Sequence, residues 1–331
     1  MPQAEIDVLT IGNAIVDVLA KVDDAFVERN GLVKGSMNLI DEARAEQLYA
    51  SMGPAIEISG GSAGNTAAGV ASFGGKAAYF GKVKADQLGG IFAHDMHGQG
   101  VRFESKAATD GPATARSFIL VTPEGERTMN TYLGACVNLN ASDVDEKIVS
   151  ASKVTYMEGY LWDKPEAKEA FKLAAKLARK AGRLASITLS DSFCVERHRD
   201  SFLELIRNDI DIVFANETEL KSLYLTQNFD GALQALRKDC NIAVVTRGAQ
   251  GSVVAHGENV VVAPAVAIPK VVDVTGAGDL YASGFLFGFT QGFDNAKSAQ
   301  LGSLAAAEVI SHVGARPEVN LRKHAEQAGL L

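Results

Sequence analysis

Residues 271–289 read VVDVTGAGDLYASGFLFGF, a β-rich run that ends in Thr-Gly-Ala-Gly-Asp and continues into an apolar, helix-like stretch. Gly276, Ala277 and Gly278 place backbone N–H groups at the predicted N-terminus of that helix, with almost no side chain in the way. Free N–H donors and the positive end of the helix dipole both favour an anion at such a position. The segment therefore predicts a strand-to-helix junction with a binding site for an anion such as phosphate.

Strand-like and helix-like segments alternate along most of the remaining sequence. Residues 6–12 and 242–246 have the form of buried strands, whereas 165–181 and 217–224 have the form of helices. Strands that alternate with helices of 10–15 residues indicate βαβ units around a parallel sheet. Residues 113–133 differ, because they alternate with period two on both sides of a Pro-Glu-Gly-Glu turn and so predict a β-hairpin.

The hairpin and residues 14–40 interrupt the alternation and are predicted to form a small separate sheet. We expect this sheet to lie as a lid over the carboxyl edge of the parallel sheet, where ligands bind in such folds. The expected large domain is discontinuous. It comprises 1–13, 41–112 and 134–331, and the lid comprises 14–40 and 113–133.

The composition limits the classes of function. The chain has 331 residues and a formal net charge of -8, so a general affinity for nucleic acid or anionic membrane is not expected. Three scattered cysteines indicate reduced thiols rather than a disulfide framework or a zinc site. No apolar run approaches the ~20 residues of a membrane span, and no signal peptide is predicted. We therefore expect a cytoplasmic protein, either a monomer or a homodimer paired through lid strands.

Asp279 directly follows the glycines of the predicted anion site, where a carboxylate is electrostatically unusual unless it has a chemical role. It could accept the proton of a hydroxyl that attacks a phosphoryl group, while the backbone amides stabilise the developing charge. The alternative is structural, because Asp commonly caps the N-terminus of a helix. These residues alone leave both interpretations open.

Two further segments follow predicted strands and should reach the same sheet edge. In Asn-Glu-Thr-Glu, Glu219 could hold Mg²⁺ through water, since Mg²⁺ prefers carboxylate and water ligands. Asn216 and Glu219 also have the spacing of a capping box, and both roles can hold together. The turn Thr-Arg-Gly-Ala-Gln-Gly at 246–251 would let backbone approach a nucleotide, although glycine-rich turns are common.

Two segments near the N-terminus suit a polyhydroxylated ligand. Residues 59–67, Ser-Gly-Gly-Ser-Ala-Gly-Asn-Thr-Ala, combine close backbone approach with an amide side chain. A glycine turn in which Ser or Asn caps the next helix is the alternative. Asn13 and Asp17 follow the first predicted strand, and the Asp17 carboxylate could accept hydrogen bonds from two sugar hydroxyls. An exposed loop aspartate is the alternative interpretation of Asp17.

The order of these segments resembles the ribokinase-like (PfkB) family of carbohydrate and nucleoside kinases over nearly the whole chain. Gly-Ala-Gly-Asp is the most specific match, and the sequence lacks the GxxxxGK[ST], HRD and DFG motifs of P-loop and protein kinases. The resemblance implies an α/β fold, a three-layer sandwich with a central, mostly parallel sheet and a small β-sheet lid. It also implies ATP at the carboxyl edge, Mg²⁺ as the metal, and an alcohol group as phosphoryl acceptor.

The resemblance assigns roles by position. Asp279 resembles the family's catalytic base, the amides of 276–278 its anion hole, and Arg127 a lid residue that closes over the phosphoryl site. Asp273 and Thr275 resemble a loop that holds a monovalent cation such as K⁺, although the usual Asp-Thr pair is Asp273-Val274 here. The ATP-binding residues implied by the family's motifs are Asn216, Thr246, Arg247, Gly248 and Gly251, with Glu219 on the metal.

Within the family, Gly60 to Asn65 together with the N-terminal Asn and Asp is similar to adenosine kinases. The expected substrate-binding residues are Asn13, Asp17, Met37, Gly61, Ser62 and Asn65. Met37 and the segment 160–162 are expected to supply apolar area for a purine, with ordinary core aromatics as the alternative for 160–162. The expected reaction is phosphorylation of the 5′-hydroxyl of adenosine. A sugar kinase acting on ribose, fructose or a related sugar is the alternative, and the intact Asp279 argues against an inactive regulatory protein.

Overall fold

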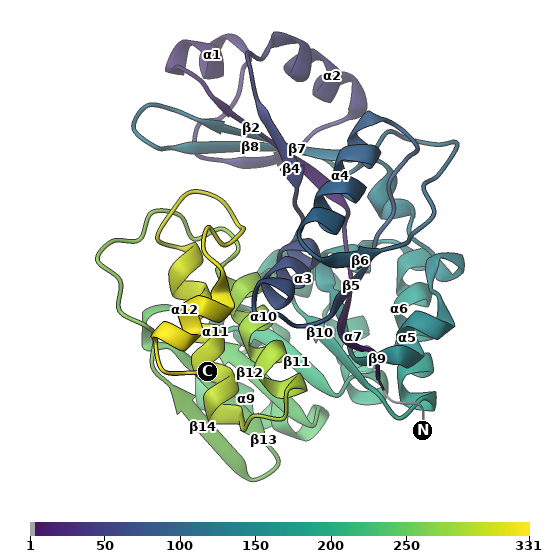
Figure 1. Cartoon of the computed structure of the whole chain (residues 1–331), viewed down its shortest axis with the longest axis vertical. Helices are drawn as coiled ribbons and strands as arrows, with labels where there is room; N and C mark the ends of the chain where they lie inside the picture. Colours follow the sequence, from purple (N-terminus) through teal and green to yellow (C-terminus); the bar gives the residue numbers. More distant parts are fainter. Residues whose placement is uncertain (1–3) are drawn as a thin grey trace.

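Within residues 4–331, which a computed structural model of the protein describes, the chain forms a nine-stranded sheet and a five-stranded sheet (Figure 1). From edge to edge the strands of the larger sheet are β14 (Asn259–Ala263), β13 (Ser252–His256), β12 (Ile242–Thr246), β11 (Ile212–Asn216), β10 (Leu184–Thr188), β9 (Ser152–Glu158), β1 (Ile6–Ile11), β5 (Ala77–Phe80) and β6 (Val101–Phe103). Pairing is parallel from β6 to β12, and β13 and β14 are antiparallel. The sheet is therefore mostly parallel, as predicted.

Helices cover both faces of this sheet and make it the middle of three layers (Figure 1). One face carries α3 (Ser62–Ser72), α10 (Ala277–Thr290) and α11 (Asn295–Val309), with α12 (Leu321–Gln327) packed on α3 and α11. The other face carries α5 (Glu146–Ala151), α6 (Pro165–Lys180), α7 (Ser192–Asp209), α8 (Glu217–Leu223) and α9 (Phe229–Asp239). Among the described residues, no helix has both the length and the hydropathy needed to cross a membrane.

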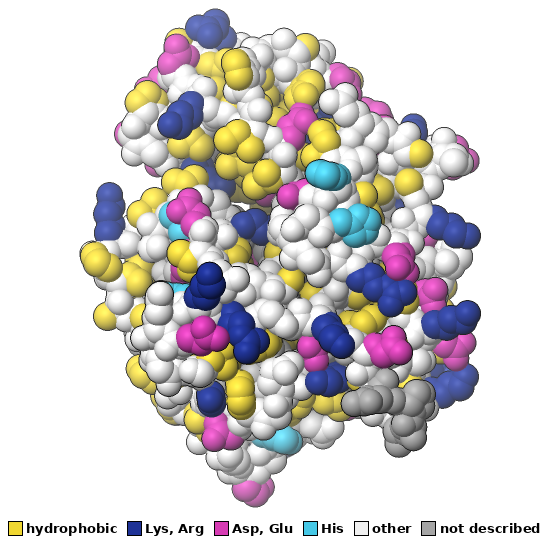
Figure 2. Space-filling view, in the orientation of Figure 1, with side chains coloured by type: hydrophobic (Ala, Val, Ile, Leu, Met, Phe, Trp, Pro, Cys, Tyr) yellow, Lys and Arg dark blue, Asp and Glu magenta, His cyan; other side chains and the backbone are white. Residues whose placement is uncertain are grey.

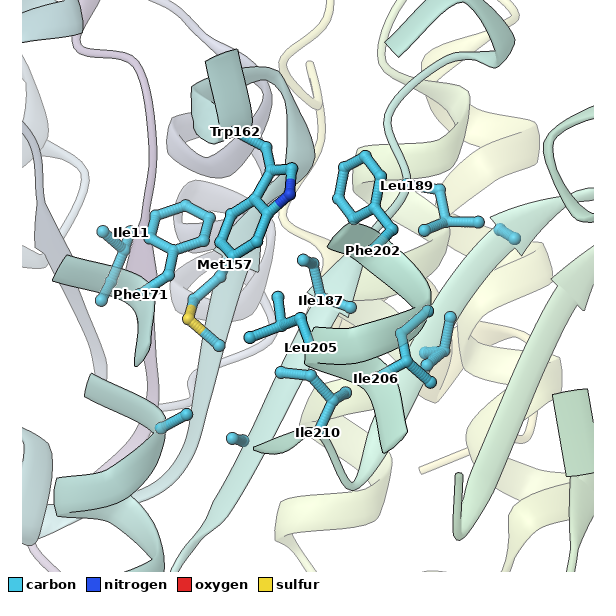
Figure 3. Close-up of a cluster of buried hydrophobic side chains, with 14 of the residues drawn as sticks. Ile11, Met157, Trp162, Phe171, Ile187, Leu189, Phe202, Leu205, Ile206 and Ile210 are labelled. Atoms are coloured by element: carbon cyan, nitrogen blue, oxygen red, sulfur yellow. The ribbon is translucent and has the colours of Figure 1, made fainter. Parts of the chain in front are cut away.

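The layer of α6 and α7 packs on the sheet through large buried side chains (Figure 3). Trp162, in the short 3-10 helix Gly159–Asp163, is only 1% exposed. Its ring lies 5.7 Å from that of Phe202 and 5.8 Å from that of Phe171, measured between centroids. The aromatic residue of this segment therefore belongs to the hydrophobic core.

Helices α10 and α11 approach each other closely because α10 contains glycines at one face. A Cβ built on Gly284 would lie 2.6 Å from the carbonyl carbon of Leu301, and one on Gly288 would lie 2.9 Å from the Cα of Ser298. No side chain fits at these distances without moving the backbone. The close packing that buries the middle of α10 therefore depends on these two positions.

The smaller sheet forms the lid and has the order β3 (Met37–Leu39), β8 (Arg127–Tyr132), β7 (Ala115–Val121), β2 (Ile15–Lys21), β4 (Ile56–Ser59). Strands β7 and β8 form the predicted antiparallel hairpin. The expected lid boundaries left out β4, which pairs antiparallel with β2, and α2 (Glu42–Ser51), which contacts β8. The chain thus stays on the lid from β3 to β4 before it enters α3. The lid also carries α1 (Asp24–Arg29), and α4 (Gln87–Gly98) contacts β2 and β4 from the large domain.

The β-rich run before α10 is a loop rather than the expected strand. Val271, Val272 and Val274 are 52%, 47% and 70% exposed. The backbone N–H of Val272 donates to the carbonyl of Ile310, directly after α11, at 2.8 Å. The segment therefore reaches α10 beside the chain that leaves α11, and only Asp273 in it is buried.

Candidate active site

The N-terminus of α10 is open, as the predicted anion site requires. Gly276 precedes the helix with φ of 79°, in the left-handed region that favours glycine. A Cβ at this position would lie 2.9 Å from the Cα of Ala315, which adds a steric reason for glycine. Within residues 4–331, no side chain caps this helix. The N–H groups of its first turn are therefore free of a competing side-chain acceptor. Ala277 N donates to the carbonyl of Val274 at 3.2 Å, and an anion could approach the other N–H groups.

Asp279 is oriented by helix α3 rather than by its own helix. Ser62 Oγ donates to Asp279 Oδ1 at 2.6 Å, and Asn65 Nδ2 donates to Asp279 Oδ2 at 2.8 Å. Both carboxylate oxygens are therefore fixed by side chains from the first turn of a helix more than 200 residues away in sequence. The alternative interpretation of Asp279 as a plain cap is not realised.

Burial raises the pKa of the Asp279 carboxyl above its ordinary value. The hydrogen bonds from Ser62 and Asn65, followed by the positive charge of Arg316, oppose this rise. A carboxylate held in one orientation with a raised pKa is better suited to accept a proton than a solvated one. Asp279 is thus an oriented carboxylate beside the predicted anion site, and its role as the base stays a prediction.

Asp17 belongs to β2 of the lid and lies close to the start of α3. A Cβ on Gly60 would overlap the Asp17 carboxyl group, so any larger residue at this position would displace that carboxyl group. Burial raises the pKa of Asp17 to about 6, while the charges of Arg316 and Arg127 lower it and that of Asp279 raises it. The negative charge of Asp279 therefore disfavours ionisation of Asp17, near the N-terminus of α3.

Gly61 and Asn13 are in direct contact. Gly61 has φ of 80°, and a Cβ on it would overlap the carbonyl oxygen of Asn13. The Asn13 side chain donates through Nδ2 to Glu158 Oε1 at 2.7 Å. Among the described residues, the side-chain oxygens of Asn13 and Asn65 have no hydrogen-bond partner. The two amide groups thus donate to carboxylates and keep an unpaired acceptor each.

Arg127 of β8 reaches from the lid to the loop before α10. It is paired with the carboxylate of Asp273 and donates to Thr275 Oγ1 at 3.0 Å. Asp273 also accepts from Thr275 Oγ1 at 2.8 Å and from the backbone N–H of Gly314 at 2.9 Å. A monovalent cation at Asp273 would have to share this carboxylate with Arg127. The lid arginine therefore lies at the predicted phosphoryl site, and the cation site stays a prediction.

Asn216 and Glu219 form a complete capping box at the start of α8. Asn216 Oδ1 accepts from Glu219 N at 2.8 Å, and Glu219 Oε2 accepts from Asn216 N at 2.9 Å. Burial raises the pKa of Glu219 to about 7. Within residues 4–331, no group of three or more metal-ligating side chains is present. Glu219 is buried and both of its carboxylate oxygens accept from Asn216, so a contact of Glu219 with Mg²⁺, through water, stays a prediction.

The turn between β12 and β13 has the compact shape expected of Thr246 to Gly251. Gly251 has φ of 83°, and a Cβ there would lie 2.7 Å from Ala265 N, so the turn requires glycine. Gly248, with φ of 55°, begins its short 3-10 helix. Arg247 lies over the ring of Phe229, 3.9 Å from its centroid, and its Nε donates to Glu217 at 2.7 Å. The guanidinium is thus held beside the turn, and its contact with a nucleotide stays a prediction.

The apolar wall expected from residues 160–162 is wrong for Trp162. Its indole is enclosed in the core between Phe171 and Phe202 (Figure 3). Tyr160 is 38% exposed, and its hydroxyl donates to the carbonyl of Ser190 at 3.2 Å. Met37 is 61% exposed on β3 of the lid, and a recess separates the lid from the large domain in Figure 2. The core alternative therefore holds for Trp162, and Met37 remains a candidate contact.

Comparisons with known proteins place the chain in a family. The model of the pfkB family of carbohydrate kinases matches residues 45–321. This chain belongs to the pfkB family. It is 58% identical to the adenosine kinase from Sinorhizobium meliloti, covering 98% of this chain and 100% of that one, with a TM-score of 0.89. It is 55% identical to a probable sugar kinase from Rhizobium etli CFN 42, covering 99% and 100%, with a TM-score of 0.91.

More distant relatives agree with this assignment. The adenosine kinase of Saccharomyces cerevisiae is 26% identical over 329 residues, 92% of this chain and 95% of that protein. This pfkB kinase is accordingly a phosphotransferase with an alcohol group as acceptor, and its fold is ribokinase-like. The family assignment and the fold predicted from the sequence are both confirmed.

Two charged residues of the site of this pfkB kinase were missed by the sequence analysis. Glu158 ends β9, is 1% exposed, and accepts hydrogen bonds from Asn13 and from Ala63 N at 2.9 Å. Burial raises its pKa to about 7. Arg316 lies after α11 and acts on both Asp17 and Asp279. An acidic residue at the end of a buried strand could have indicated Glu158, whereas the loop around Arg316 carries no recognisable motif.

Proposed function

We propose that this kinase transfers the γ-phosphoryl group of ATP to the 5′-hydroxyl of adenosine, giving AMP and ADP. The observation that carries the proposal is the Asp279 carboxylate, which Ser62 and Asn65 of α3 hold in one orientation beside an open helix N-terminus. Asp17, on the lid, is close enough for the charge of Asp279 to act on it. The 58% identity to an adenosine kinase over nearly the full chain supports adenosine as the acceptor.

In the proposed reaction, the Asp279 carboxylate takes the proton of the 5′-hydroxyl as that oxygen forms a bond to the γ-phosphorus. The bond between this phosphorus and the bridging oxygen breaks, and its electron pair leaves with ADP. The N–H groups of residues 276–278 would stabilise charge on the transferred phosphoryl oxygens. Arg127 would exchange the Asp273 carboxylate for one of these oxygens, because both lie at the same loop.

The metal would serve the donor side of the site. Mg²⁺ bound with ATP neutralises charge on the phosphate groups. Glu219 would hold the metal through water while its capping box with Asn216 orients the carboxylate. The glycine-rich turn at Thr246 to Gly251 would receive the nucleotide.

Substrate choice is proposed to depend on the hydroxyls of the ribose. An ionised Asp17 can accept hydrogen bonds from both hydroxyls of a furanose diol. A site that pairs with such hydroxyls rejects an analogue that lacks one, because a buried polar group is then left unpaired. The 55% identity to a probable sugar kinase favours a second candidate, a sugar kinase of the same family.

A substrate panel with MgATP separates the two candidates. ADP release should be measured with adenosine, 2′-deoxyadenosine, ribose and fructose. We expect adenosine to exceed both sugars in kcat/KM, and 2′-deoxyadenosine to be weaker by ~10²-fold, as for pockets that read a hydroxyl. Asp17→Ala should remove most of the discrimination between adenosine and its 2′-deoxy analogue. Faster turnover of ribose or fructose than of adenosine would replace this proposal with the sugar-kinase function.

A further inference from the structure

The guanidinium of Arg316 connects three elements around the candidate site. Nη1 donates to the backbone oxygen of Gly64 in α3 at 2.7 Å and to Gln99 Oε1, directly after α4, at 3.0 Å. Nη2 donates to the backbone oxygen of Ser59, the last residue of β4, at 2.9 Å and to its Oγ at 3.1 Å. One side chain thus fixes the end of a lid strand, the first turn of α3 and the end of α4 relative to one another.

These contacts lie immediately beside residues that adjoin the two carboxylates. Gly64 stands between Ser62 and Asn65, the two side chains that orient Asp279. Ser59 precedes Gly60, against which the Asp17 carboxyl group packs. A displacement at the bond to Gly64 would therefore be transmitted to Asp279 through α3, and one at the bonds to Ser59 would be transmitted to Asp17 through β4.

The charge of Arg316 has a second effect on the same carboxylates. Asp95, Asp17, Asp279 and Tyr79 are the titratable groups that act on the guanidinium. Asp17 is also influenced by Arg127 and Asp279. Asp279 in turn acts on Tyr156, Glu158 and Tyr160. Within this set, burial raises the pKa of Asp17 and of Asp279, and Arg316 opposes the rise in both.

We propose that Arg316 is a positioning residue for phosphoryl transfer, which locks the base of the lid onto α3 and presents a positive charge to Asp17 and Asp279. The inference rests on the proposed function for the roles of those two carboxylates. Arginine suits the task because its planar fork of donors can serve several acceptors at once while it remains charged. A lysine would supply the charge without the fork, and a glutamine would supply donors without the charge.

This difference defines the test. R316Q, R316K and the control R322Q would be assayed for kcat/KM of adenosine between about pH 5 and pH 9. Arg322 lies on α12, is largely exposed and pairs with Glu326, so R322Q should behave as the wild type. In R316Q the acid limb of the profile should move to higher pH by about one unit, the effect of losing a nearby opposite charge. In R316K the limb should stay in place while kcat falls several-fold. An unmoved limb in R316Q would overturn the proposal.

A second measurement needs neither substrate nor turnover. The pKa of the Asp17 carboxyl can be followed by carbon-13 NMR in the ligand-free protein, with Asp17→Asn to assign the signal. It should rise in R316Q and match the wild type in R316K and R322Q. If R316Q no longer unfolds cooperatively, the R316K variant is used to test the proposal. An unchanged kcat or a raised Asp17 pKa in R316K would contradict the proposal. If the wild-type protein fails to phosphorylate adenosine, only the proposed function is overturned. The NMR titration would still test whether Arg316 lowers the pKa of Asp17.

Discussion

At the scale of single residues, the site is built from carboxylates whose charges are costly to bury. Asp17, Glu158, Asp279 and Glu219 all have pKa values raised first by burial. Asp279 and Glu158 accept hydrogen bonds from residues distant in sequence, and Glu219 accepts them from the N-terminus of its own helix. The positive charges that act on Asp17 belong to Arg316 and Arg127. Such groups are retained at the expense of stability where their chemistry is needed.

Removal of the proposed base gives a first prediction. Asp279→Asn keeps the shape of the side chain but cannot accept the hydroxyl proton, so kcat should fall by ~10² or more. ATP binding, measured by calorimetry, should persist because the nucleotide turn and α10 are unchanged. A variant that turns over like the wild type would exclude Asp279 as the base.

The raised pKa of Asp17 gives a second prediction, on stability. Its folded pKa of about 6 lies above the ordinary value of 3.8, so the folded protein binds this proton more readily than the unfolded chain. The charged form therefore destabilises the fold above pH 6, and the penalty disappears as pH falls towards 4. Asp17→Asn should melt at a higher temperature than the wild type at pH 8, with the difference shrinking towards pH 4. An equal difference at both pH values would contradict the assigned pKa.

At the scale of elements, backbone contacts between helices decide which residues are tolerated. The approach of α10 to α11 leaves no room at Gly284, where a Cβ would lie 2.6 Å from a backbone carbon of Leu301. By contrast, Gly90 in α4 is exposed, and within residues 4–331 nothing lies within 4 Å of a Cβ built there. The two helical glycines therefore provide a matched pair.

A third prediction follows from this pair. Gly284→Ala should lower the free energy of unfolding by ~1–3 kcal/mol, because the helices must move apart. Gly90→Ala should leave it unchanged or raise it by up to ~1 kcal/mol, since alanine favours helix over glycine. Urea unfolding of both variants checks this, and equal stabilities would show that the α10–α11 packing adapts without cost.

The capping box of α8 gives a fourth prediction that separates structure from metal binding. Glu219→Gln retains a side chain that can complete the box, whereas Glu219→Ala removes it and should cost ~1 kcal/mol of stability. Both variants lose the carboxylate and should need more Mg²⁺ for half-maximal activity. If the Mg²⁺ titration of Glu219→Gln matches the wild type, Glu219 has only the structural role.

At the scale of the whole molecule, the sequence could predict the strands, the helices and the hairpin better than the contacts between distant segments. Alternating strands and helices gave the parallel sheet, and period-two alternation gave the β7–β8 hairpin, because both patterns are local. The membership of β4 in the lid was missed because its pairing with β2 spans some 40 residues. Trp162 was misplaced because an aromatic residue after a strand has the same local pattern in a core or in a pocket.

The candidate site shows the same difference between local motifs, which the sequence predicts, and contacts between distant residues, which it does not. Short motifs indicated Asp279, Asn216 and the glycine turns because each motif occupies a single junction between two elements, although the side chains that orient Asp279 come from α3. Glu158 and Arg316 were missed because each acts through contacts with residues far away in the chain. No periodicity or spacing within one sequence encodes such pairs.

The hydrogen bond between Ser62 and Asp279 joins residues separated by 217 positions. Contacts of such long separation form late, since a large loop must close before they contribute. During synthesis, the chain must therefore emerge almost completely before the first turn of α3 can meet its partner carboxylate. An incomplete nascent chain could already contain the lid and most of the parallel sheet, but it would lack the proposed base until α10 docks.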